Sequence, residues 1–117
     1  MAGKRVWLVS VVVTSSHWLR QELHQVEQQA GYEFEFTGSV PEGRRNARRR
    51  PMVIIGADLV GRVRNPFYCG GFVVVAALEV AGPQTFSHAA RIHASYVIAL
   101  PSGRDWLTDQ LVRIAAG

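Results

Sequence analysis

The most conspicuous group of residues able to bind a ligand is a basic run in the first half of the chain. It reads Arg44-Arg45-Asn46-Ala47-Arg48-Arg49-Arg50, with five guanidinium groups in seven residues. Planar guanidinium forks bind phosphate groups well, so the run predicts contact with nucleic acid, anionic lipid or an acidic protein patch. A solvated helix or loop face is the simpler interpretation. Because no aromatic residue is interleaved with the run, it does not predict a stacking platform for single-stranded nucleic acid.

The other side chains able to hold a metal or attack a substrate are scattered. The four histidines have spacings typical of helix surfaces: His17, His24, His88 and His93. Because few acids lie near them and Cys69 is the single cysteine, they predict no metal site. No base or helix N-terminus is assured beside Cys69, so we expect an inert thiol. We therefore expect no enzymatic activity, no metal and no cofactor.

Composition narrows the class of protein further. The 117 residues are 48% hydrophobic and carry a formal net charge of +4, with Lys4 as the one lysine against twelve arginines. This bias fits a GC-rich genome or phosphate recognition. A lone cysteine excludes an intramolecular disulfide and fits a reducing cytoplasm. The apolar run Val6–Val13 is too short to span a bilayer, so we expect a strand there and a single domain over residues 1–117.

Strand-like and helix-like segments alternate along the chain. Apolar or alternating runs predict five strands, at Val6–Val13, Tyr32–Thr37, Met52–Ile55, Phe72–Ala77 and Tyr96–Leu100. Helices are predicted after each of them, at Trp18–Ala30, Arg44–Arg50, Ala57–Val63, Gly82–His93 and from a capping pattern at Ser102 onward. Phe86, Tyr96 and Trp106 have core-like spacing near the last two helices. An exposed dimer face is the alternative for these three aromatic residues.

The pattern of the strands predicts the fold. Four of them are uninterrupted apolar runs, as in a parallel sheet covered by helices on both faces. Right-handed crossovers then give a doubly wound α/β domain. The strand at Tyr32–Thr37 has one acidic face and suits an edge. We therefore predict a five-stranded flavodoxin-like sheet with the order 2-1-3-4-5.

In such a sheet, ligands bind at the carboxyl ends of the strands. This arrangement resembles the receiver domain of bacterial response regulators. That family has an acidic pair after the first strand, a phosphoacceptor Asp, a hydroxyl residue and a Lys after later strands. The matching positions in this chain are Thr14, Ser15, Gly56, Ala76 and Leu100. The resemblance therefore implies a receiver fold without the phosphotransfer groups, and Asp58, two residues past the acceptor position, is a poor substitute.

A closer resemblance is to the degenerate receiver-like N-terminal domains of septum-site-determining and Flp-pilus-assembly proteins of the TadZ/CpaE type. The resemblance rests on three sequence segments, Val53–Asp58, Gly71–Val75 and Ala94–Pro101. The resemblance implies a bacterial protein-interaction, dimerisation or localisation module in septum-site or pilus-assembly positioning, with a P-loop ATPase domain following. One alternative is an electrostatic module that binds nucleic acid or anionic lipid through the run from Arg44 to Arg50. Another is a small-ligand sensor at the strand ends.

Overall fold

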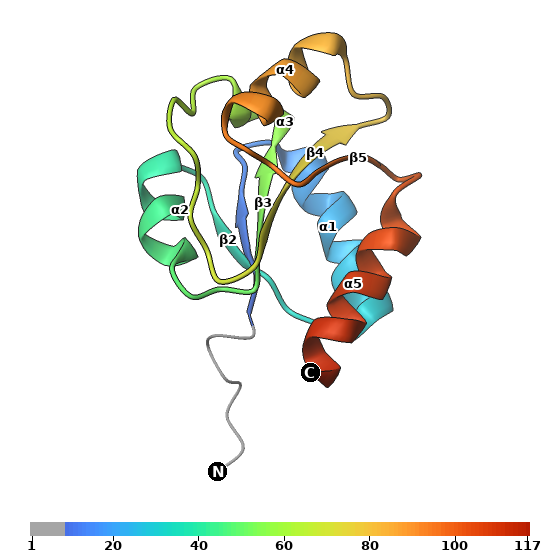
Figure 1. The fold of residues 1–117 in the computed structure, drawn as a ribbon. Helices are drawn as coiled ribbons and strands as arrows, with labels where there is room; N and C mark the ends of the chain where they lie inside the picture. Colours follow the sequence, from blue (N-terminus) through green and yellow to red (C-terminus); the bar gives the residue numbers. More distant parts are fainter. Residues whose placement is uncertain (1–8) are drawn as a thin grey trace.

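One parallel sheet organises residues 9–117, the part of the chain that this computed structural model describes (Figure 1). Its five strands are β1 (Val11–Val13), β2 (Glu35–Thr37), β3 (Met52–Gly56), β4 (Phe72–Leu78) and β5 (Tyr96–Leu100). All neighbouring pairs run parallel, and the order is β2-β1-β3-β4-β5. The predicted flavodoxin-like fold class and strand order are confirmed.

A helix follows each strand. These helices are α1 (His17–Ala30), α2 (Val40–Ala47), α3 (Ala57–Val60), α4 (Pro83–Arg91) and α5 (Arg104–Ala116). α1 and α5 cover one face of the sheet, and α2, α3 and α4 cover the other (Figure 1). None of the helices in the described part has the length and apolar character needed to cross a membrane.

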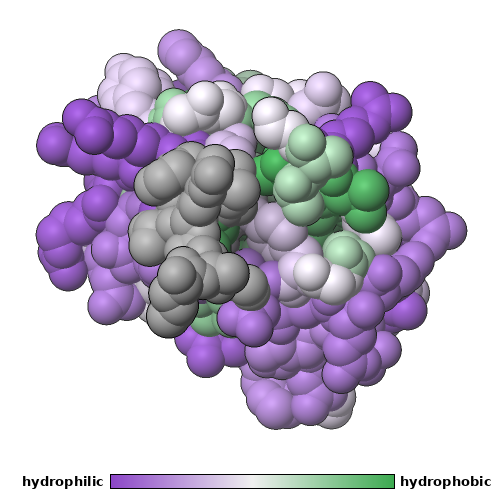
Figure 2. All heavy atoms as spheres, turned by 90° about the horizontal axis from the view of Figure 1, so that it is seen from below, coloured by the Kyte–Doolittle hydropathy of each residue, from purple (hydrophilic) through white to green (hydrophobic). Residues whose placement is uncertain are grey.

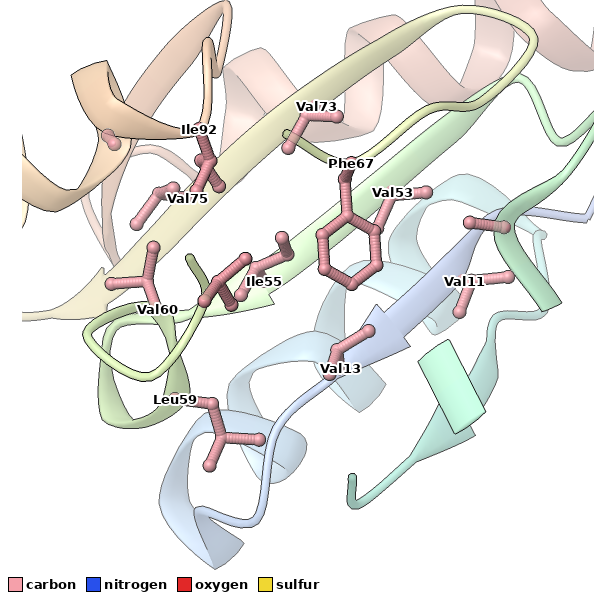
Figure 3. Packing of buried hydrophobic residues seen from close by; sticks show 13 residues of the cluster. Val11, Val13, Val53, Ile55, Leu59, Val60, Phe67, Val73, Val75 and Ile92 are labelled. Carbon is pink, nitrogen blue, oxygen red and sulfur yellow. The ribbon is translucent and has the colours of Figure 1, made fainter. Parts of the chain in front are cut away.

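The apolar strands are buried on both sides because successive side chains point to opposite faces. On one face, residues such as Val53, Ile55 and Val75 form a cluster with side chains of α3 and Ile92 (Figure 3). On the other face, Ile54 and Val74 contact apolar residues of α1 and α5. This two-sided burial explains why valine and isoleucine dominate the central strands.

The start and end of α1 agree with the sequence signals. The Ser16 side chain caps the helix by accepting a hydrogen bond from the Leu19 amide at 3.2 Å. Gly31 ends the helix in the left-handed conformation, with φ of 63°. Glycine adopts this conformation without the steric cost that a Cβ would impose.

Several predicted boundaries are wrong. β2 begins at Glu35 rather than Tyr32, although Tyr32 and Phe34 are both buried. α2 begins at Val40, several residues early, because Ser39 caps it and Pro41 suits its first turn. The residues from Val6 to Leu8 lie outside the described part of the chain.

The end of the domain also departs from prediction. α5 begins at Arg104, and its cap residue Gly103 makes no side-chain hydrogen bond. The predicted cap at Ser102 is wrong, because its hydroxyl donates to the Ala99 carbonyl at 3.2 Å instead. Phe86 is 54% exposed and is not a core residue, whereas Trp106 is partly buried.

The surface seen from below is mostly hydrophilic, with one compact apolar area (Figure 2). The carboxyl end of α5 lies at this end of the molecule (Figure 1). Phe72 is the first residue of β4, and Ile114 lies near the end of α5. Both are partly buried and pack against the core. The buried layers therefore reach the underside of the domain.

Two neighbouring residues of α5 test which face of this helix holds the fold together. Leu111 is fully buried, and Val112 is 49% exposed. We expect Leu111→Ala to lower the free energy of unfolding by about 2–5 kcal/mol, because it leaves a cavity. Val112→Ala should change it by less than about 0.5 kcal/mol. Urea denaturation measures both values, and equal losses would contradict the helix orientation.

Candidate functional site

The predicted site residues lie at the carboxyl edge of the sheet, as parallel strands require. Thr14 follows β1, Gly56 ends β3 and Leu100 ends β5. Gly56 is in register with Ala76, but β4 continues for two residues past Ala76, to Leu78. Ala76 is therefore beside the acceptor position without being at the end of its own strand.

Two acids follow strands at this edge, Glu79 directly after β4 and Asp58 after β3, and the carboxylate of Asp58 is held by the loop after β1. The Thr14 hydroxyl donates to Oδ1 of Asp58 at 2.7 Å. The Ser15 amide and hydroxyl donate to Oδ2 at 2.9 and 3.0 Å. Thr14 Oγ1 also accepts from the Ser16 amide at 3.0 Å, which ties the same loop to the start of α1. The carboxylate therefore links the β1–α1 and β3–α3 connections.

Gly56 is compatible with this arrangement only because it lacks a side chain. A Cβ there would collide with Oδ1 of Asp58 and would stand 2.7 Å from Thr14 Oγ1. It would also lie 2.8 Å from a methyl group of Leu19. The space that a side chain at position 56 would need is therefore filled by the Asp58–Thr14 pair.

Leu100 and Ala76 have become part of the core. Both are fully buried, in the cluster that includes Leu107 and Leu111 of α5. The Arg104 guanidinium of α5 forms an ion pair with Glu22 of α1 at 2.7 Å. At position 100 the chain therefore places an aliphatic side chain in the protein interior.

Two hollows lie at the carboxyl edge of the sheet, and Asp58 lines the first of them. One, of about 320 Å³, is lined by Ser16, Leu19, Asp58 and the end of β4. The other, of about 480 Å³, lies between Trp18 of α1 and Pro101. Within residues 9–117 no three His, Cys, Asp or Glu side chains are grouped closely enough to hold a metal ion.

The structure divides the arginine run into structural and exposed members. Arg50 is 9% exposed and donates to the Val9 carbonyl at 3.0 Å and to Glu35 at 3.0 Å. Arg44 donates to two loop carbonyls. Arg45, Arg48 and Arg49 are the exposed members. Sequence reasoning treated the five residues alike and missed this difference.

Cys69 is partly buried, in the loop before β4. Burial raises the pKa of its thiol, and a backbone hydrogen bond at Gly71 opposes this effect in part. A thiol with a raised pKa has little thiolate at neutral pH, so it is a weak nucleophile.

The fold and the carboxyl edge together define a receiver-like domain. A sequence-family model described as Rv3660c-like, CheY-like N-terminal domain matches residues 12–117, and the chain belongs to that family. The match confirms the predicted resemblance to a receiver-like N-terminal domain. Among curated proteins, no sequence matches this chain.

Solved structures with the same fold include pilus-assembly proteins and signal receivers. A pilus assembly-related protein from Burkholderia pseudomallei has 17% identity and a TM-score of 0.57, over 99% of this chain and 96% of its own. The pilus assembly protein CpaE from Burkholderia thailandensis has 19% identity and a TM-score of 0.55, over 93% and 99%. A signal receiver domain from Clostridium thermocellum has 12% identity and a TM-score of 0.61, over 91% and 95%. At these identities the likeness establishes the fold.

A double-mutant cycle tests the link between the two loops. We expect Thr14→Val to lower the free energy of unfolding by about 1–2 kcal/mol, because the hydroxyl serves both Asp58 and the Ser16 amide. In the Asp58→Ala background, Thr14→Val should lower the free energy of unfolding by about 1 kcal/mol less than it does in the wild-type chain. The control is Thr108→Val, since the buried Thr108 hydroxyl has no partner among the described residues. Its stability should be unchanged or higher, and equal losses at both threonines would contradict the assignment.

Proposed function

We propose that this domain is a pseudo-receiver that works by binding proteins rather than by accepting a phosphoryl group. The observation that carries the proposal is an exposed apolar face across α4, β5 and α5. Phe86 of α4 is 54% exposed and Tyr96 of β5 is 47% exposed, and the partly buried Trp106 of α5 borders them. Large apolar side chains gathered on one face favour a protein interface.

The geometry of this face supports the proposal. A hollow of about 290 Å³ lies between α4 and β5, with Phe86 and Tyr96 in its lining. The Tyr96 ring packs on Trp106 of α5 with centroids 4.8 Å apart, and on Phe72 of β4 with centroids 5.5 Å apart. These ring contacts fix Tyr96 at the open edge of the sheet, so the face is rigid before it meets a partner.

The carboxyl edge supports the second half of the proposal. The position of a receiver's acceptor is Gly56, and the space beside it is filled by Asp58 and Thr14. The positions of the acidic pair are Thr14 and Ser15, which serve as donors to Asp58. Ala76 and Leu100, at the remaining two positions, are core residues.

The wider role that we propose follows the family and its structural neighbours. Two neighbours are described as pilus-assembly proteins, and the resemblance given in the sequence analysis implies a P-loop ATPase domain after this one, in septum-site or pilus positioning. We propose that this domain acts in the cytoplasm in such a system, as a dimerisation or localisation module attached to an ATPase. The partner on the α4–β5–α5 face is then a second copy of this chain.

Self-association tests this assignment. We expect sedimentation velocity to show a dimer that forms as the protein concentration rises. Phe86→Glu should weaken the dimer at least about tenfold, because it places an unpaired charge in an apolar interface. The matched control is Val80→Glu, since Val80 is 82% exposed in the connection between β4 and α4. A dimer weakened equally by both substitutions, or a monomer at every concentration, would contradict the proposed interface.

A further inference from the structure

We infer that the carboxyl end of α2 and the loop beside it form a binding site for single-stranded nucleic acid. Four arginines make up this α2 basic surface: Arg44, Arg45, Arg48 and Arg49. The exposed ring of Tyr68 completes it. The site is separate from the α4–β5–α5 face and depends on no part of the function proposed above.

The positive charge of this surface is not neutralised. Arg45, Arg48 and Arg49 are exposed, and none of them forms an ion pair with a described residue. The acid of α2 is Glu42, which lies in the first turn, at the opposite end of the helix. Unpaired guanidinium groups on one surface attract phosphate groups. When they bind, the counterions condensed on the nucleic acid are released.

Arg44 is held in place without losing its charge. Its guanidinium donates to the Pro66 carbonyl at 2.9 Å and to the Asn65 carbonyl at 2.6 Å, and it lies 4.5 Å from the centre of the Phe67 ring. None of these partners is an anion. Arg44, Arg45 and Arg48 line an open hollow of about 350 Å³, where a phosphate group can reach all three.

The loop beside α2 supplies the aromatic ring that the arginine run lacks. It is joined to the α2 segment at both ends, by the Arg44 contacts and by the Gly70 amide, which donates to the Arg50 carbonyl at 2.7 Å. Tyr68 lies between these two attachments and is 77% exposed. Sequence reasoning found no aromatic residue near the arginines because Tyr68 comes much later in the chain.

This combination favours a single strand over a membrane surface. An exposed aromatic ring in a loop that is attached to the arginine segment can stack a base while the arginines contact the adjacent phosphates. Attachment to anionic lipid relies on clusters of about four to eight basic residues, often on a helix with several apolar side chains. The α2 basic surface has four arginines, at the low end of that range, and the exposed Trp18 and Val80 lie at the carboxyl edge of the sheet, away from the end of α2.

The test uses fluorescence anisotropy with a dye-labelled oligothymidylate at several salt concentrations. We expect the wild-type chain to bind with a log–log salt slope of about −2, from about −0.7 for each of three phosphate contacts. Arg45→Gln/Arg48→Gln should weaken binding about tenfold and reduce the slope to about −0.7. The control Arg91→Gln/Arg113→Gln removes the same charge from exposed positions of α4 and α5. It should keep the affinity within about twofold.

Tyr68 separates stacking from simple charge attraction. Tyr68→Ala should weaken binding about tenfold without changing the salt slope, and Tyr68→Phe should retain wild-type affinity. Melting temperatures confirm that each variant is folded. Equal losses in the two arginine pairs, or no binding to the oligonucleotide, would overturn the inference. Binding to vesicles of anionic phospholipid in place of the oligonucleotide would also overturn it.

Discussion

The carboxyl edge of the sheet depends on one interaction, the contact of the Asp58 carboxylate with Thr14 and Ser15. Three donors from the β1–α1 loop converge on this one side chain. The contact requires glycine at position 56, because any Cβ there would displace the carboxylate. It also uses the hydroxyl groups that stand where a receiver has its acidic pair. A single contact therefore involves Thr14, Ser15 and Gly56, three of the positions that the resemblance matches to the phosphotransfer groups of a receiver.

The rest of the domain can keep the receiver fold because its core does not depend on those groups. The sheet is stabilised by burial of valine, isoleucine and leucine on both faces. Leu100, at the position that the resemblance matches to a receiver's lysine, is fully buried and adds to this core. The function that we propose uses the outer surfaces of the domain.

Two surfaces are available for that function, and they differ in chemistry. The α4–β5–α5 face is apolar and aromatic, with Tyr96 fixed by its contacts with Trp106 and Phe72. The α2 basic surface is formed by guanidinium groups and one exposed ring. They lie on different elements, so both can be occupied at once. A protein that dimerises through one surface would present two copies of the other.

The fold was predictable because four strands are apolar runs, whereas the site required geometry. The strand order follows from Met52–Ile55 and similar runs. The late start of β2 at Glu35 was hidden, because Tyr32 and Phe34 are buried without being in a strand. The role of Asp58 depends on a loop that turns its carboxylate toward Thr14, which spacing does not show. Arg50 is an arginine like its neighbours in the run. Its structural role depends on tertiary hydrogen bonds to Val9 and Glu35, which the sequence does not show.

The most direct measurement is the intact mass of the purified chain after incubation with acetyl phosphate and Mg²⁺, beside a receiver domain known to accept phosphate. We expect an unmodified mass for this chain, because the Asp58 carboxylate is engaged by Thr14 and Ser15. A gain of one phosphoryl group that disappears in Asp58→Asn would contradict it.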